Sequence, residues 1–178
     1  ALLLAAEGKK VCIADLDIVN PYFRTKDSAK VLENAGVTLI SPQFANTNVD
    51  LPALPAESYR LVQDKSVYGI MDIGGDDRGA YALGRYVPSI LEENNYRMAF
   101  VANCYRPLTR DTESTLEVLA EIEEACGIRF TGLVNNSNLG EETTADHVLA
   151  TMDYAEAVAE AKARTIRFLY FIQHELGF

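Results

Sequence analysis

The chain has 178 residues, of which 48% are hydrophobic and 24% charged, and it carries a formal net charge of −10. Such a length suits one domain with a substantial core, so we predict a single domain over residues 1–178. The negative charge disfavours a broad grip on nucleic acid or on an anionic membrane surface. No apolar run reaches the roughly 20 residues that a membrane span needs, so no membrane span is expected.

The predicted elements alternate between short strands and helices. Residues 1–6 are interpreted as the end of a buried helix that Gly8 closes. Strands are predicted at 11–14, 67–71, 98–102 and 130–134, with further candidates at 38–41 and 166–172. The first four are apolar throughout, so we expect both of their faces to be buried. Helices are expected at 112–126, 145–152 and 154–163. This order predicts βαβ units, and therefore an α/β fold with a mostly parallel sheet flanked by helices.

Polar residues stand where four of these strands end, namely Asp15, Asp72, Asn103 and Asn135. Each of them alone is also typical of an ordinary turn. In open parallel sheets, however, ligands bind beyond the carboxyl ends of the strands, where such residues converge. We therefore predict a binding site at one edge of the sheet, with Asp15, Asp72 and Asn135 on it.

Two acidic motifs indicate the chemistry of that site. Asp15 and Asp17 form a strand-ending DxD, which suits a hydrated magnesium ion at the first carboxylate and a water-orienting role for the second. An isolated DxD also suits a turn with a helix cap. In the second motif, Asp72 closes an apolar strand and Gly74 and Gly75 follow. Glycine there lets a backbone N–H approach a terminal phosphate without obstruction by a side chain.

The segment KKVCIADLD at 9–17, together with MDIGG at 71–75 and GLVNN at 132–136, resembles the MinD/ParA group of P-loop ATPases. The resemblance covers most of the chain. The sequence especially resembles an uncharacterised bacterial branch of the CobQ/CobB/MinD/ParA nucleotide-binding proteins. That branch is similar in the longer strings DLDIVNPYFR, FANTNVDLPALPA, GGDDRGAYALGRY and NCYRPLT, all of which occur here.

This resemblance implies a three-layer P-loop NTPase-like fold and an ATP-binding protein that hydrolyses ATP with Mg²⁺ as a nucleotide-dependent switch. It implies specific roles for six residues: Asp15 in the outer shell of the metal, Asp72 as the Walker B carboxylate, Asp17 positioning the attacking water, Gly74 and Gly75 beside the γ-phosphate, and Asn135 at the adenine edge. An amide offers both the donor and the acceptor that adenine requires.

The sequence departs from the family pattern because it contains no GxxxxGK[ST] loop. In the family this loop holds the β- and γ-phosphates. We therefore expect the first strand and this loop to be missing, and the chain to start in the helix that follows them. Without the loop, this chain is expected to bind nucleotide poorly. We also expect a gap one strand wide between strands 11–14 and 67–71.

Two other classes of function stay open. One is an ATP-dependent amide-forming synthetase of the cobyrinate-diamide or dethiobiotin type, and the other is a nucleotide-binding or scaffold protein without turnover. The nucleotide is the expected partner, and a homodimer stays open as a second. Three widely spaced cysteines, Cys12, Cys104 and Cys126, favour a reducing cytoplasm over a disulfide framework or an iron–sulfur cluster. For the two histidines, His147 and His174, surface or capping roles are expected.

Overall fold

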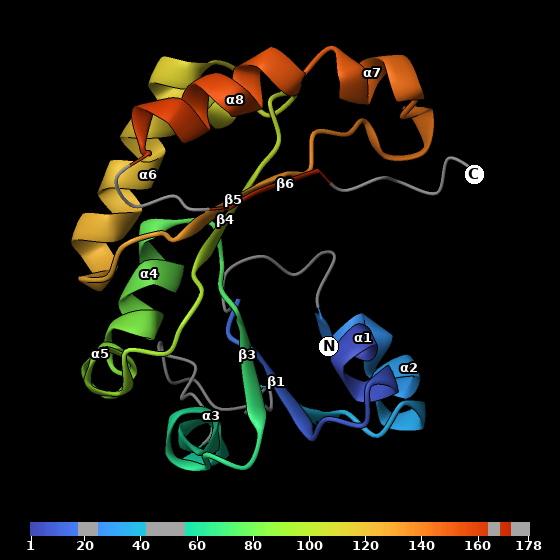
Figure 1. Ribbon diagram of the computed structural model, residues 1–178, viewed down its shortest axis with the longest axis vertical. Helices are drawn as coiled ribbons and strands as arrows, with labels where there is room; N and C mark the ends of the chain where they lie inside the picture. Colours follow the sequence, from blue (N-terminus) through green and yellow to red (C-terminus); the bar gives the residue numbers. More distant parts are fainter. Residues whose placement is uncertain (18–24, 42–55, 164–167, 172–178) are drawn as a thin grey trace, which may run out of the picture. The chain divides into compact units, whose positions relative to one another are not determined.

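The computed structural model describes residues 1–17, 25–41, 56–163 and 168–171 of the chain (Figure 1). The fold is mixed α/β, with small parallel sheets flanked by helices, as the order of the predicted elements indicates. The chain divides into two compact units, Ala1–Asn94 and Asn95–Phe178, and each is described by itself below. A single domain over 1–178 stays a prediction. Within the described ranges, no helix is long and apolar enough to cross a bilayer.

The first unit is built around a parallel three-stranded sheet in the order β2-β1-β3. Its described elements are, in chain order, α1 (Leu2–Ala6), β1 (Val11–Asp15), the 3₁₀ turn η1 (Thr25–Ser28), α2 (Ala29–Asn34), β2 (Thr38–Ile40), η2 (Ala56–Tyr59), α3 (Arg60–Gln63), β3 (Tyr68–Asp72), α4 (Asp77–Gly84) and α5 (Val87–Glu93).

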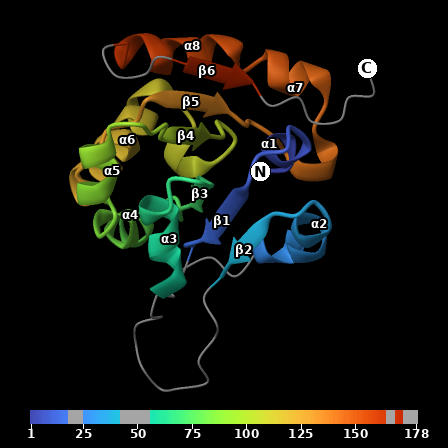
Figure 2. The same ribbon diagram turned by 60° about the horizontal axis from the view of Figure 1, so that its bottom comes forward.

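Strand β1 is the centre of this unit because both of its faces are covered. Val11 and Ile13 pack with Leu32 of α2, and α1 contributes to the same cluster. Cys12 and Ala14 point the other way and pack with Val62 of α3. Both views show α1 and α2 on one side of β1 and α3 on the other (Figures 1 and 2). Alternate residues of one short apolar strand thus support two helical layers.

The gap that was expected beside β1 is not present, because β1 pairs directly with β3. Strands 11–14 and 67–71 are direct neighbours, with Val11 opposite Tyr68 and Asp15 opposite Asp72 along a continuous parallel register. No strand's width separates them, so the prediction of a gap at this place is wrong. The described strands nevertheless form two separate three-stranded sheets, in which β3 and β4 are both edge strands.

Burial on both faces was predicted for all four strands. In the first unit it is confirmed for β1 but not for β3. All five residues of β1 are buried, whereas Tyr68 of β3 is 48% exposed. The reason is position, since β3 has a described neighbour on one side only. The helix expected at residues 1–6 was also predicted to be buried. Helix α1 ends before Gly8 as predicted, but its Leu3 is 83% exposed, so the prediction of burial is wrong.

The second unit contains a parallel sheet in the order β4-β5-β6. Its described elements are β4 (Ala99–Ala102), η3 (Pro107–Thr109), α6 (Thr112–Cys126), β5 (Gly132–Asn135), η4 (Gly140–Glu142), α7 (Ala145–Leu149), α8 (Met152–Ala161) and β6 (Phe168–Phe171). Helices α6 and α8 lie side by side on the same side of the sheet (Figure 1). Phe100 and Phe130 meet edge to face with ring centroids 5.3 Å apart, which closes the core at the start of the sheet.

Helix α6 has the bounds that the sequence predicts, because both of its ends carry strong local signals. The Asp111 carboxylate accepts a hydrogen bond from the Ser114 backbone N–H at 2.9 Å, and Gly127 ends the helix with φ +75°. The Thr115 hydroxyl lies 2.8 Å from the Tyr154 hydroxyl, which links the first turn of α6 to α8. This local network is structural, and it fixes the helix layer of the second unit.

Candidate functional site

The two carboxylates at the ends of β1 and β3 lie side by side, as the sequence predicts. Asp15 and Asp72 are register partners on neighbouring parallel strands, so their backbones are about 4.8 Å apart. The Leu16 N–H donates to the Asp72 carbonyl at 2.8 Å, which continues the pairing past the last strand residue. Asp15 is fully buried and Asp72 is half-buried. The first unit therefore places two carboxylates together at the carboxyl end of its sheet.

A segment distant in sequence covers these two carboxylates. The Thr25 hydroxyl donates to Asp72 Oδ2 at 2.5 Å, and the Lys26 backbone N–H points to Asp15 Oδ2 at 3.4 Å. Both donors belong to η1, which leads directly into α2. Thr25 could not be predicted from the sequence, because it is 47 residues away from Asp72 and belongs to no motif.

The second acid of the DxD motif lies against the glycine turn that follows β3. A Cβ atom added to Gly74 would lie 2.9 Å from Asp17 Oδ1, so the two residues are already in close contact. The DxD motif and the glycine turn that follows Asp72 therefore meet in space. A Cβ added to the neighbouring Gly75 would meet nothing within 4 Å, which leaves the backbone there approachable by a ligand.

The same turn is fastened to the start of α4. Asp76 Oδ1 accepts a hydrogen bond from the Gly79 N–H at 2.9 Å and so caps the helix. Gly79 lies against Gly74 so closely that a Cβ would fall 2.3 Å from the Gly74 carbonyl oxygen. Neither this cap nor α4 was among the elements predicted from the sequence. The acidic residue three positions before Gly79, at the end of a glycine pair, is the signal that could have found them.

The pair of carboxylates suits magnesium better than a metal ion whose ligands must all come from protein side chains. Among the residues that the structure describes, no three His, Cys, Asp or Glu side chains gather closely enough to hold a metal ion between them. Mg²⁺ keeps several waters and is typically held by one or two carboxylates together with substrate phosphates. Asp15 and Asp72 therefore fit a divalent cation that keeps several of its waters.

Asn135, predicted at the adenine edge, ends β5 in the second unit. Its amide nitrogen donates to the Thr151 hydroxyl at 2.8 Å and to the Thr151 carbonyl at 3.3 Å. Its oxygen accepts from the backbone and the hydroxyl of Ser137, at 3.1 and 2.6 Å. The side chain is buried and uses its full bonding capacity inside the unit. Recognition of a base by Asn135, which stays a prediction, would require an exchange of these bonds.

The cysteines and His147 occupy ordinary structural positions. Burial raises the pKa of the Cys12 thiol and of the Cys126 thiol, which keeps both protonated and unreactive at neutral pH. Cys104 is partly exposed. His147 accepts a hydrogen bond from the Thr144 N–H and donates its own backbone N–H to the Thr144 hydroxyl, so its predicted capping role is confirmed. His174 lies outside the described residues.

Comparison with known proteins assigns the chain to no family. No protein-family model matches the sequence, and neither a curated protein nor a solved structure matches the chain.

Proposed function

We propose that this protein binds ATP with Mg²⁺ at the carboxyl ends of β1 and β3 and hydrolyses it as a nucleotide-dependent switch, on a P-loop NTPase-like fold of the MinD/ParA kind. The observation that carries the proposal is the pairing of Asp15 with Asp72 in register, with Asp17 against the Gly74 turn. Two carboxylates beside an open glycine backbone suit a magnesium ion that bridges protein and phosphate.

The residues have distinct roles in this proposal. Asp15 and Asp72 hold the hydrated metal, and Gly75 offers its backbone to the terminal phosphate. Asp17 orients the attacking water as a general base, which requires a carboxylate close to, but separate from, the metal pair. The contact of Asp17 with Gly74 supports this arrangement, because it holds the carboxylate at the turn where the phosphate would lie.

The first prediction tests turnover in the intact protein. Phosphate release from ATP should require Mg²⁺ and should stop when the metal is chelated. Asp17→Ala should lower turnover by about 10²–10⁴-fold, the usual contribution of a positioned general base, while ATP affinity changes little. Asp153→Ala, which removes an exposed carboxylate from α8 in the second unit, is the matched control and should leave both quantities unchanged.

Each result of this assay has a definite meaning. Equal loss of affinity and turnover in Asp17→Ala would contradict the role given to Asp17. Magnesium-dependent binding without turnover would identify a non-hydrolysing nucleotide-binding or scaffold protein. Turnover that appears only when a carboxylic acid and an amine donor are added would favour the amide-forming synthetase. No binding of ATP by the intact protein would overturn the proposal.

A further inference from the structure

The contacts of η1 with Asp15 and Asp72 give this short segment a part in the proposed site. Its first two residues, Thr25 and Lys26, each direct a donor at one of the two carboxylates. One donor is a side-chain hydroxyl and the other is a backbone N–H. A single turn of 3₁₀ helix therefore spans both members of the acidic pair.

The segment is well placed to hold those carboxylates still. Directly after η1, α2 inserts Leu32 into the core cluster that contains Val11 and Ile13 of β1. The backbone of Thr25 is thus connected through one turn to side chains that pack on the same strand that ends in Asp15. A hydroxyl anchored in this way restricts the rotation of the Asp72 carboxyl group about its side-chain bonds.

We propose that Thr25 is a positioning residue, which orients the Asp72 carboxylate for a divalent cation by donating a hydrogen bond to Oδ2. The other oxygen, Oδ1, would then be available to the metal or to one of its waters. Hydrogen-bonded partners of metal-binding carboxylates typically contribute 10–100-fold to metal affinity, because they fix the orientation of the ligand before the metal arrives. This inference rests on the proposed metal role of Asp15 and Asp72.

The second prediction uses Mn²⁺ alone as the probe, titrated into the intact protein without nucleotide and followed by its electron paramagnetic resonance signal. Thr25→Val keeps the shape of the side chain but removes the hydroxyl, and it should weaken Mn²⁺ binding by about 10–100-fold. Thr25→Ser restores the hydroxyl and should bind Mn²⁺ nearly as the unaltered protein does. Thr38→Val makes the same change at an exposed position of β2 and is the matched control.

A purely structural role for Thr25 would give a different pattern. In that case the valine and serine variants would lower the unfolding temperature to a similar extent, and Mn²⁺ affinity would follow stability, not the hydroxyl. Equal Mn²⁺ affinity in Thr25→Val and the unaltered protein would overturn the inference, as would the absence of Mn²⁺ binding in the unaltered protein.

The outcome for Thr25 is separable from the outcome for ATP. A hydroxyl-dependent Mn²⁺ site in a protein that does not bind ATP would leave the role of Thr25 intact and would overturn the proposed function. The opposite result would be magnesium-dependent ATP turnover with the same Mn²⁺ affinity in Thr25→Val and the unaltered protein. It would support the proposed function and overturn the role of Thr25.

Discussion

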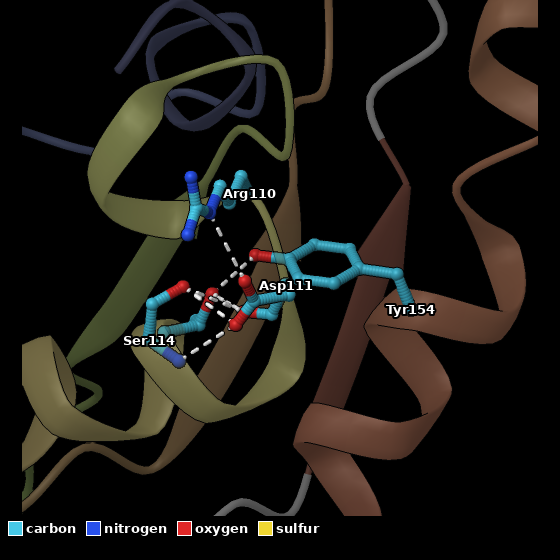
Figure 3. Close-up of polar contacts among 5 residues, drawn as sticks. Arg110, Asp111, Ser114 and Tyr154 are labelled. Carbon is cyan, nitrogen blue, oxygen red and sulfur yellow. Dashed lines mark hydrogen bonds and ion pairs between the residues drawn. The ribbon is translucent and has the colours of Figure 1, made fainter.

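The carboxylate of Asp111 accepts hydrogen bonds from the backbone N–H and the hydroxyl of Ser114, at 2.9 and 2.8 Å (Figure 3). These two bonds lower the pKa of the Asp111 carboxyl below its ordinary value. A lowered pKa in the folded state means that the charged form favours folding. The contribution is complete above the unfolded pKa of about 3.9 and is lost as the pH falls through the lower folded value.

The third prediction follows from that sign. Asp111→Ala should lower the unfolding temperature at pH 7, and the difference from the unaltered protein should shrink as the pH falls below about 3.9. Thermal unfolding monitored by circular dichroism from pH 7 to pH 2.5 measures both effects. Asp111→Ser is the control, because it keeps a helix-capping oxygen that does not titrate. A stability difference that stays constant over this pH range would show that the charge of Asp111 contributes nothing.

At the scale of elements, helix α4 depends on two glycines in different ways. Gly79 lies in the first turn and touches the Gly74 carbonyl, whereas a Cβ at Gly84, in the last turn, would meet nothing within 4 Å. The fourth prediction is that Gly79→Ala destabilises the protein by about 1–3 kcal/mol, because the added methyl group forces the turn away from the helix. Gly84→Ala should instead stabilise it by about 0.5–1 kcal/mol, since alanine favours helix more than glycine does.

Chemical denaturation of the two variants measures this contrast. It also tests the geometry of the candidate site, because the turn that Gly79 supports holds Gly74 against Asp17. Equal effects of the two substitutions would contradict the close contact between Gly79 and Gly74. A loss of stability at Gly84 alone would contradict the helical conformation assigned to the end of α4.

Elements with a local signal could be predicted from the sequence, and those set by distant contacts could not. Helix 112–126 has a capping aspartate before it and a glycine after it, and its bounds agree with the prediction. The strand predicted at 130–134 begins only at Gly132, because the Thr131 and Gly132 N–H groups both donate to the Met98 carbonyl. The contact of Thr25 with Asp72 and the direct pairing of β1 with β3 depend on how the chain crosses over, which no local pattern specifies.

At the scale of the molecule, the two described sheets each end in an edge strand that lacks the usual protection. Strand β3 carries no charge before its terminal Asp72, and β4 is apolar throughout. Tyr68 of β3 is 48% exposed and Val101 of β4 is 58% exposed. Natural edge strands are normally blunted by charges, prolines or bulges, because an apolar edge invites pairing with another chain. One cooperative domain over 1–178 stays the prediction that the length of the chain makes.

The fifth prediction tests that cooperativity with the three cysteines. In the folded protein a thiol reagent should label Cys104 first, since Cys12 and Cys126 are 1% and 4% exposed and burial raises the pKa of both thiols. In a Cys104→Ser background, Cys12 then reports opening of the first unit and Cys126 opening of the second. A single domain requires both thiols to become reactive over the same range of urea concentration, because coincident transitions indicate all-or-none unfolding. Two separate midpoints, determined by mass spectrometry of the labelled peptides, would show instead that the chain folds as two independent domains.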